Sequence, residues 1–239
     1  MKPLLVLAAF PVVLMGWASC SHSGTGHAAL PDPRAVDKSV PEYKNPFHPS
    51  TYAHFVARKD YRKTYDVYKD DTLLNRQPKK SRKIFVCLDE QRGQYLVDGL
   101  VAMDFPLSSG VKAYPTKTGD YAVISKKEDH ASNLYGKMYD AEGKCINYNA
   151  ESTDPIPEGG RFDGSPMPYW QRLTNAGLGL HGGKVRRHPV SHGCVRLPRN
   201  VAEILYRQTS IGTPVTIQKT PLPVPEIQKV PAGQQHKGV

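Results

Sequence analysis

The chain of 239 residues is 39% hydrophobic and 9% aromatic, so it carries enough apolar side chains to bury a substantial core. This length suits one main domain with flanking segments, and the 21 prolines and 20 glycines predict long loops and irregular ends. The formal net charge of +10 favours anionic partners such as acidic lipid or wall polymers. Because no nucleic-acid-binding motif accompanies the charge, we expect no nucleic-acid partner, and a basic, soluble surface is the plainer explanation.

Residues 1–20 are typical of an export signal. The apolar run from Leu4 to Met15 is too short for a membrane-spanning helix, and small residues follow it just before Cys20. This pattern is similar to a lipoprotein signal, in which the cysteine carries lipid and becomes the mature N-terminus, although Trp17 departs from the residue type usual at its position. Ordinary signal cleavage near the same site is the alternative. In both cases we expect an exported protein of the periplasm or cell envelope, and in the first case it is attached to a membrane by lipid on Cys20.

The next segment, residues 21–82, is predicted to be a tether followed by an N-terminal arm. Residues 21–50 are rich in Ser, Gly, His and Pro, a composition typical of a linker that lets a domain stand away from a membrane. Residues 51–77 carry aromatic and aliphatic side chains with partly helical spacing. We expect a short helical or irregular arm whose aromatic side chains pack on the main domain.

The main domain is predicted over residues 83–219 and is mainly β. The apolar run at 84–88 indicates a strand that is buried on both faces. Arg92-Gly93 suits a turn, and Asp98-Gly99 is a strong hairpin signal. Further strands are predicted at 94–97, 100–107, 121–124 and 214–217.

Three other segments complete the chain. Residues 125–168 are polar and rich in Gly and Pro, which predicts either a disordered insertion or a lid over a site. Asn200 is expected to cap a helix that runs to about Gln208, with apolar residues along one face. The Pro-rich tail at 220–239 is predicted to be disordered.

The four cysteines differ in their surroundings. Cys87 lies in an apolar strand pattern and is predicted to be a buried thiol, whereas Cys145 lies in a polar segment. A disulfide between these two stays open as an alternative in an oxidising compartment. Cys20 belongs to the signal, and Cys194 has neighbours that indicate chemistry.

The residues around Cys194 can supply each part of an acyl-transfer site. A thiol attacks a carbonyl only as thiolate, so it needs a base, and His181 and His192 are both close in sequence. Gly193 lets the backbone turn sharply and expose consecutive amide hydrogens to a developing oxyanion. Arg196 can hold a carboxylate through paired hydrogen bonds.

This segment has two other interpretations. It could be a plain turn, since a cysteine near a histidine is by itself a weak signal. It could also bind zinc, and the candidate ligands would be His181, His188, His192 and Cys194. No Cys-x-x-Cys or His-x-x-x-His spacing supports zinc, so we expect neither a metal nor a cofactor.

The segments His181-Gly182-Gly183 and Ser191-His192-Gly193-Cys194-Val195-Arg196-Leu197 resemble the active-site signature of the L,D-transpeptidase family, with its YkuD-type catalytic domain. The interval between them is shorter than in the commonest form of the family and carries Pro189. Other segments that resemble this family over residues 83–219 are 84–92, 105–110, 115–121 and 212–215.

The resemblance implies a fold and roles for individual residues. The fold is a mixed β-sheet sandwich with a short helix after Cys194. Cys194 would be the nucleophile and His181 its base, oriented by the carbonyl of Gly182, while the amides of His192, Gly193 and Cys194 would bind the oxyanion. Candidate substrate-binding residues are Arg196, Tyr169, Trp170 and Ser191, with simple core packing as the alternative for Tyr169 and Trp170.

The implied reaction is attack of Cys194 on a tetrapeptide stem of peptidoglycan, followed by transfer of the resulting thioester to an amine, for cross-linking or wall remodelling. An L,D-carboxypeptidase of the same fold, with water as acceptor, is one alternative. A non-catalytic wall-binding lipoprotein is the other. The sequence indicates neither the acceptor, nor the residue at stem position three, nor the oligomeric state.

Overall fold

The computed structural model describes residues 29–78 and 81–237. The predicted export signal, Cys20 and the first part of the predicted tether lie outside these residues. The described chain is mainly β, with strands in three sheets, and this confirms the expected fold class. No helix within the described ranges is long and apolar enough to cross a membrane.

The largest sheet has six strands in the order β1-β4-β3-β2-β13-β5. Its strands are β1 (Tyr68–Lys69), β2 (Arg82–Cys87), β3 (Arg92–Val97), β4 (Leu100–Pro106), β5 (Gly119–Ala122) and β13 (Pro214–Gln218). The pair of β13 and β2 is parallel and the other pairs are antiparallel. The last four residues of β2 are fully buried, as its continuous apolar run predicts.

The two turns predicted in this sheet have different outcomes. Asp98 and Gly99 form the hairpin turn between β3 and β4, with positive φ values of 51° and 80°. The predicted turn at Arg92-Gly93 is wrong, because both residues belong to β3 and the chain turns just before them, where Gln91 has a φ of 49°. Arg92 is fully buried and paired with the buried carboxylate of Asp104, a tertiary contact that local sequence does not reveal.

A second sheet of four strands holds the segments nearest Cys194. Its order is β12-β11-β10-β6, with β6 at Ser125–Lys127, β10 at Trp170–Arg172, β11 at Gly179–Gly182 and β12 at Val195–Leu197. Helix α3 (Arg199–Gln208) follows β12 and buries Val201, Ala202 and Leu205 in the core between the two sheets. The predicted cap at Asn200 is wrong, since Asn200 lies inside the first turn and the N-cap is Pro198, which makes no side-chain capping hydrogen bond.

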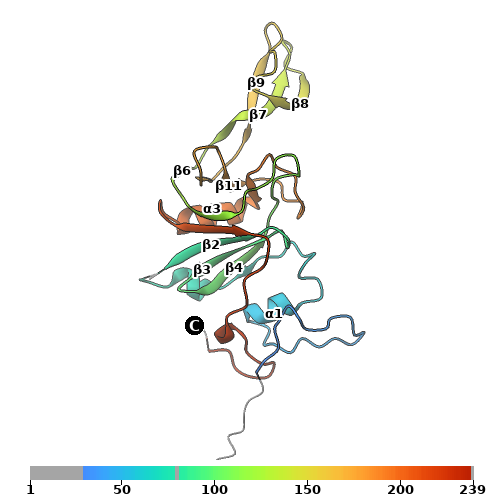
Figure 1. The fold of residues 1–239 in the computed structure, drawn as a ribbon, viewed down its shortest axis with the longest axis vertical. Helices are drawn as coiled ribbons and strands as arrows, with labels where there is room; N and C mark the ends of the chain where they lie inside the picture. Colours follow the sequence, from blue (N-terminus) through green and yellow to red (C-terminus); the bar gives the residue numbers. More distant parts are fainter. Residues whose placement is uncertain (1–28, 79–80, 238–239) are drawn as a thin grey trace, which may run out of the picture.

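The segment 125–168 is ordered, so the alternative of a disordered insertion is wrong. After β6 it forms a three-stranded sheet of β7 (Ala131–Tyr139), β8 (Cys145–Glu151) and β9 (Arg161–Pro166), in the order β8-β7-β9. Figure 1 shows this sheet projecting from one end of the molecule. Cys145 lies at the start of β8, and Cys145 and Cys87 are both free thiols, so they form no disulfide.

The N-terminal arm and the C-terminal tail pack together at the other end of the molecule (Figure 1). Helices α1 (Tyr52–Ala57) and α2 (Asp71–Asn75) lie in the arm, and α1 belongs to a second apolar cluster with Phe47, Tyr61 and Val224. The described part of the predicted tether is packed as well, because Phe47 is fully buried and pairs with Pro231.

The prediction of a disordered tail is wrong for residues 220–237. The short helix η1 (Glu226–Gln228) brings the Gln228 side chain to the edge of β4. There the Gln228 side-chain amide accepts from the Val101 amide and donates to the Val101 carbonyl, both at 2.9 Å. A buried strand edge needs such partners, and a side chain supplies them here in place of another strand.

Candidate active site

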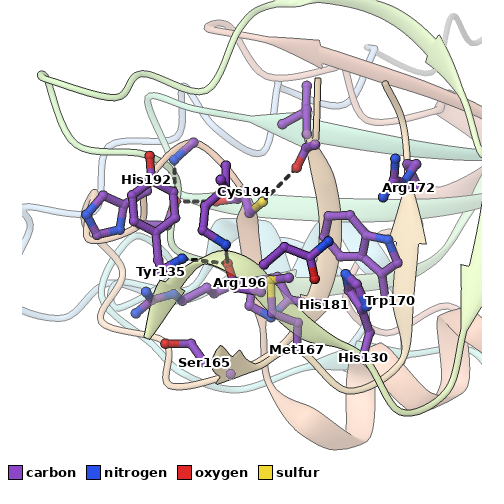
Figure 2. Close-up of a pocket in the computed structure, with 18 of the residues that line it drawn as sticks. His130, Tyr135, Ser165, Met167, Trp170, Arg172, His181, His192, Cys194 and Arg196 are labelled. Carbon is purple, nitrogen blue, oxygen red and sulfur yellow. Dashed lines mark hydrogen bonds between the residues drawn. The ribbon is translucent and has the colours of Figure 1, made fainter. Parts of the chain in front are cut away.

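The pairing of β11 with β12 places the predicted base and nucleophile on one face of the second sheet. The two strands are parallel, and their register sets Leu180 opposite Val195 and His181 opposite Arg196. Side chains alternate along a strand, so Leu180 and Val195 point into the core while His181 and Arg196 point away from it. Cys194 lies in the bend just before β12 and lines the same pocket as His181 (Figure 2).

These side chains line a cavity of about 890 Å³. Of the residues predicted for the site, the cavity brings together His181, Ser191, His192, Gly193, Cys194, Arg196 and Trp170. Gly182 lies beside it and acts through its carbonyl. The insertion lines the opposite side through Ser132 to Gly136, Tyr148 and Asn149, so the ordered three-stranded sheet is a wall of the pocket.

The imidazole of His181 is oriented by its own neighbour in the chain, and burial favours its neutral form. Its Nδ1 lies 3.0 Å from the carbonyl oxygen of Gly182 and donates to it, which leaves Nε2 as the acceptor nitrogen. Burial lowers the pKa of His181 to about 4; the Gly182 hydrogen bond opposes this shift, and the charge of Arg196 adds to it. At neutral pH the ring is therefore uncharged and able to take a proton.

The thiol of Cys194 is also neutral in this arrangement. Burial raises its pKa above the ordinary value, while a backbone hydrogen bond from Gly179 and the charge of Arg196 oppose the shift. The thiol donates to the carbonyl of Gly177 at 3.3 Å. Among the described residues no hydrogen bond joins the sulfur to the ring of His181, and burial favours the neutral form of both groups.

Side-chain hydroxyl groups stabilise the turn before β12 through hydrogen bonds to its backbone. The Ser191 hydroxyl donates to the carbonyl of Cys194 and accepts from the Gly193 amide at 3.2 Å. Gly193 has a φ of 111°, which only glycine adopts without strain. In the described part of the chain, the amides of His192 and Cys194 have no acceptor, whereas the Gly193 amide, also expected to bind an oxyanion, already donates to Ser191.

Thr116 also holds this turn in place through hydrogen bonds, and it is not among the site residues predicted from the sequence. Its hydroxyl donates to the Gly193 carbonyl at 2.7 Å and accepts from the Gly110 amide at 2.8 Å. The backbones of Gly110 and Gly193 are in such close contact that a Cβ on Gly110 would lie 2.9 Å from the Gly193 nitrogen. The Pro-Thr segment noted for its family resemblance thus braces the cysteine turn.

The structure separates Tyr169 from Trp170. Trp170 is 3% exposed and lines the pocket, with its ring 6.1 Å from that of His181. The expectation that Tyr169 lines the cleft is wrong: its ring packs 5.9 Å from Tyr206, and the Arg199 guanidinium lies 5.5 Å from it. Successive residues point in opposite directions near a strand, and Tyr169 also has a positive φ of 57°.

Within the described chain, two of the histidines considered as zinc ligands, His188 and His192, do not lie in a cluster of metal-binding side chains. His188 is exposed and lies outside the pocket lining, and His192 stacks on an aromatic ring of the insertion. Over residues 29–78 and 81–237, no group of three His, Cys, Asp or Glu side chains is placed to hold a metal ion.

Besides the predicted Arg196, the pocket contains cations and aromatic groups that the sequence did not reveal. Its cationic side chains are Lys117, Arg172, Lys184 and Arg196, and none of them takes part in a salt bridge recorded for the described residues. No described Asp or Glu lines it. His130, from the start of the insertion, lies with its ring 5.1 Å from that of Trp170. Apart from Arg196, these residues are scattered between 117 and 184, so no local motif marks them.

Fold and site together define a β-sheet domain built around a cysteine and a histidine that share one cationic pocket. The family profile of the YkuD L,D-transpeptidase catalytic domain matches residues 81–217, more than half of the chain. The chain therefore belongs to the L,D-transpeptidase catalytic domain family, as the resemblance predicted.

Individual relatives cover parts of the chain. It is 31% identical over 121 residues to a probable L,D-transpeptidase 3 of Mycobacterium tuberculosis, a match that spans 48% of this chain and only 38% of that protein. Among solved structures, an L,D-transpeptidase from Mycobacterium smegmatis is 22% identical, covers 58% of each chain and has a TM-score of 0.45. L,D-transpeptidase 3 of M. tuberculosis with a faropenem-derived adduct is 23% identical, with 58% and 60% covered and a TM-score of 0.42.

Proposed function

We propose that this protein is a peptidoglycan L,D-transpeptidase that forms a thioester between Cys194 and a tetrapeptide stem and transfers it to an amine. One observation carries the proposal. Cys194 and His181 line one pocket, and the Gly182 carbonyl accepts from Nδ1 of the imidazole, so that Nε2 is free to accept a proton. Membership of the L,D-transpeptidase family supports the same chemistry.

In the acylation step, the Cys194 thiol leaves the carbonyl of Gly177 and turns toward His181. The thiol proton passes to Nε2 of His181 as the sulfur attacks the amide carbonyl between an L-centre and a D-centre of the stem. The carbon–sulfur bond forms, and the carbon–nitrogen bond then breaks. The imidazolium returns its proton to the departing amine of the terminal D-residue, so the active site is neutral again.

The free amides of His192 and Cys194 are the donors for the oxyanion of the tetrahedral intermediate. A well-placed donor of this kind contributes about 3 kcal/mol to transition-state stabilisation in related acyl transfers. In the second step the amine of an acceptor stem attacks the thioester, and neutral His181 takes its proton. The new amide bond forms as the carbon–sulfur bond breaks, and the imidazolium returns the proton to the departing Cys194 sulfur. Water in place of the amine would give L,D-carboxypeptidase activity from the same intermediate.

The charge of the pocket fits a substrate that carries carboxylates. Arg196 lies opposite His181 in the register of the strands and is half-buried, so its guanidinium can hold a stem carboxylate close to the reacting sulfur. Arg172 on β10 is a second cation in the same pocket. Export of the protein to the periplasm or cell envelope, with lipid on Cys20, stays a prediction from the sequence and would bring this pocket to the wall.

The direct test is to incubate the purified protein with tetrapeptide-bearing muropeptides and to analyse the products by mass spectrometry. Cross-linked dimers are expected with wild type and with Cys145→Ala, which removes a cysteine outside the pocket. Neither dimers nor loss of the terminal residue are expected with Cys194→Ala.

The same experiment separates the alternatives. Loss of the terminal residue without dimers would identify a carboxypeptidase. Stem binding that survives Cys194→Ala, with no product from wild type, would identify a non-catalytic wall-binding protein and would contradict the proposal.

A further inference from the structure

The loop from residue 183 to residue 190 forms part of the pocket mouth. It connects β11, which carries His181, to residues 191–194, the turn that carries Cys194 and is called the nucleophile turn below. Gly183 and Lys184 line the pocket, and the Gly183 amide donates to the Leu197 carbonyl at 2.8 Å. Beyond Lys184 the loop leaves the pocket, and its conformation there depends on contacts with other parts of the chain.

Arg187 makes the longest-range of these contacts. Its guanidinium donates to the Thr64 carbonyl at 2.9 Å and to the Glu90 carbonyl at 3.1 Å. Thr64 belongs to the N-terminal arm, and Glu90 to the turn between β2 and β3. Arg187 also has a φ of 56°, a left-handed backbone conformation that a residue with a long side chain rarely adopts unless its surroundings hold it there.

The arm offers Arg187 a fixed acceptor. The Thr64 carbonyl also accepts from the buried guanidinium of Arg92 at 3.1 Å, and Arg92 is paired with the buried carboxylate of Asp104. The hydroxyl groups of Tyr52 and Tyr61 donate to the same carboxylate at 2.7 and 2.9 Å. The arm is therefore fastened to the main sheet directly beside the point that Arg187 reaches.

The nucleophile turn has its own support, which does not involve Arg187. The Gln91 side chain accepts from the Ser109 amide at 3.0 Å, and the Ser109 carbonyl accepts from the amides of Val190 and Ser191 at 2.8 and 3.1 Å. The Arg186 backbone also holds the middle of the loop, since its amide donates to Ser108 and its carbonyl accepts from Tyr65. Loss of Arg187 should thus loosen the loop and the pocket mouth without detaching them, while Ser191 and the cysteine turn stay in place.

We propose that Arg187 is a positioning residue that anchors the 183–190 loop to the N-terminal arm, so that the arm shapes the mouth of the substrate pocket. This inference rests on the proposed function for its kinetic part only. The arm is then a component of the stem-binding site, in addition to any role as a tether.

The test compares Arg187→Ala with Arg186→Ala in the full-length protein. Arg186 is the adjacent arginine; it is exposed, and within the described residues only its backbone makes hydrogen bonds. We expect Arg187→Ala to raise the KM for the tetrapeptide on the order of tenfold, the effect of losing one or two hydrogen bonds from a charged group. Values of kcat and the rate of Cys194 alkylation by iodoacetamide should stay within about twofold of wild type, and Arg186→Ala should behave like wild type.

Arg187→Lys is the conservative variant. It keeps the charge, but an ammonium group cannot donate to two carbonyls with the planar geometry of a guanidinium, so the KM should be restored only in part.

Hydrogen exchange of the loop amides provides a readout that does not depend on turnover. Residues 183–190 should exchange faster in Arg187→Ala than in Arg186→Ala and wild type. Faster exchange in a protein without turnover would support the anchor and contradict the proposed function. If both variants turn over normally, with the same loop exchange and the same KM, Arg187 does not anchor the loop. If Arg187→Ala lowers kcat and the Cys194 alkylation rate by the same factor, the site is generally damaged, and this too would overturn the proposal.

Discussion

The phenol ring of Tyr135 lies parallel to the imidazole of His192, with 4.0 Å between the ring centroids and 13° between the planes. Tyr135 comes from β7 of the three-stranded sheet, whereas His192 belongs to the turn that carries Cys194 (Figure 2). Tyr114 packs on the same imidazole at 4.9 Å. The projecting sheet is thereby joined to the nucleophile turn through one aromatic cluster.

Replacing Tyr135 with alanine should weaken stem binding, because the insertion loses its contact with the turn. An aromatic pair of this geometry contributes about 0.5–1.5 kcal/mol, so we expect the KM to rise roughly two- to tenfold. Tyr139→Ala is the matched control, since Tyr139 lies on the same strand but outside the pocket. Steady-state kinetics on tetrapeptide substrates provide the measurement. Equal KM values for the two variants would show that the aromatic cluster does not contribute to the site.

Thr116→Val should reduce the acylation rate on the order of tenfold, because it leaves the Gly193 carbonyl and the Gly110 amide without their shared partner. The valine has nearly the same shape, so packing beneath the turn is kept. Thr116→Ser retains the hydroxyl and should remain within about threefold of wild type. Single-turnover acylation, followed by mass spectrometry, distinguishes the variants. A slow Thr116→Ser protein would attribute the effect to the methyl group and not to the hydrogen bonds.

The pH dependence should show that the free protein holds a neutral thiol and a neutral imidazole. Because burial raises the pKa of Cys194, its alkylation by iodoacetamide should keep rising through the alkaline range and should not level off near neutrality. The acylation rate should fall on the acid side near pH 4, where His181 becomes protonated and can no longer accept the thiol proton. An alkylation midpoint below pH 7 would instead indicate a preformed ion pair.

The same lowered pKa makes the fold sensitive to acid. Unfolded histidine binds a proton near pH 6.5, whereas folded His181 binds one only near pH 4, so the unfolded state carries more protons between these values. Stability should therefore fall as the pH drops through this window, by about 3 kcal/mol in total for His181. In denaturant titrations His181→Gln should lose that part of the pH dependence, and an unchanged slope would contradict the lowered pKa.

The cations of the pocket should make stem binding depend on salt. Raising the ionic strength from about 0.05 to 0.5 M shortens the screening length several-fold, so the KM of a carboxylate-bearing stem should rise. Arg172→Gln should weaken this dependence. Arg161→Gln removes an equal charge from the insertion, outside the pocket and already paired with Asp163, and should leave it unchanged. If the KM does not change with ionic strength in wild type or in either variant, the pocket cations do not contribute to stem binding.

Asp104 holds the N-terminal arm to the main sheet and should be critical for stability. Its carboxylate accepts from Arg92, Tyr52, Tyr61 and Gln94. Asp104→Ala leaves the Arg92 guanidinium buried without its charge partner, which should reduce the free energy of unfolding by about 3–5 kcal/mol. The exposed acid Asp163 is the comparison, and Asp163→Ala should cost less than about 1 kcal/mol in chemical denaturation. Similar losses in the two variants would contradict this role.

Local patterns were sufficient for much of the catalytic domain. The apolar run of β2, the Asp98-Gly99 hairpin and the closing strand β13 each follow from alternation and turn chemistry over a few residues. The Ser-His-Gly-Cys motif indicated the residues that the pocket brings together, because Ser191 to Arg196 are contiguous and one turn with its following strand carries them all.

The failures share a different cause, which is pairing between distant segments. Arg92 looked like a turn residue because its partner Asp104 becomes its neighbour only in the folded sheet. Gln228 looked like part of a disordered tail because its partners are the backbone groups of Val101, more than a hundred residues away. The pocket residues of the insertion, Tyr135 among them, lie in a polar segment with no motif, and only tertiary packing brings them to His192.

The most direct measurement is the mass of the intact protein during turnover of a tetrapeptide stem. A transient increase equal to the stem without its terminal D-residue is expected, located by peptide mapping to Cys194 and missing in Cys194→Ala. Retained turnover in Cys194→Ala, or an adduct that maps to Cys87 or Cys145, would contradict thioester formation at this cysteine.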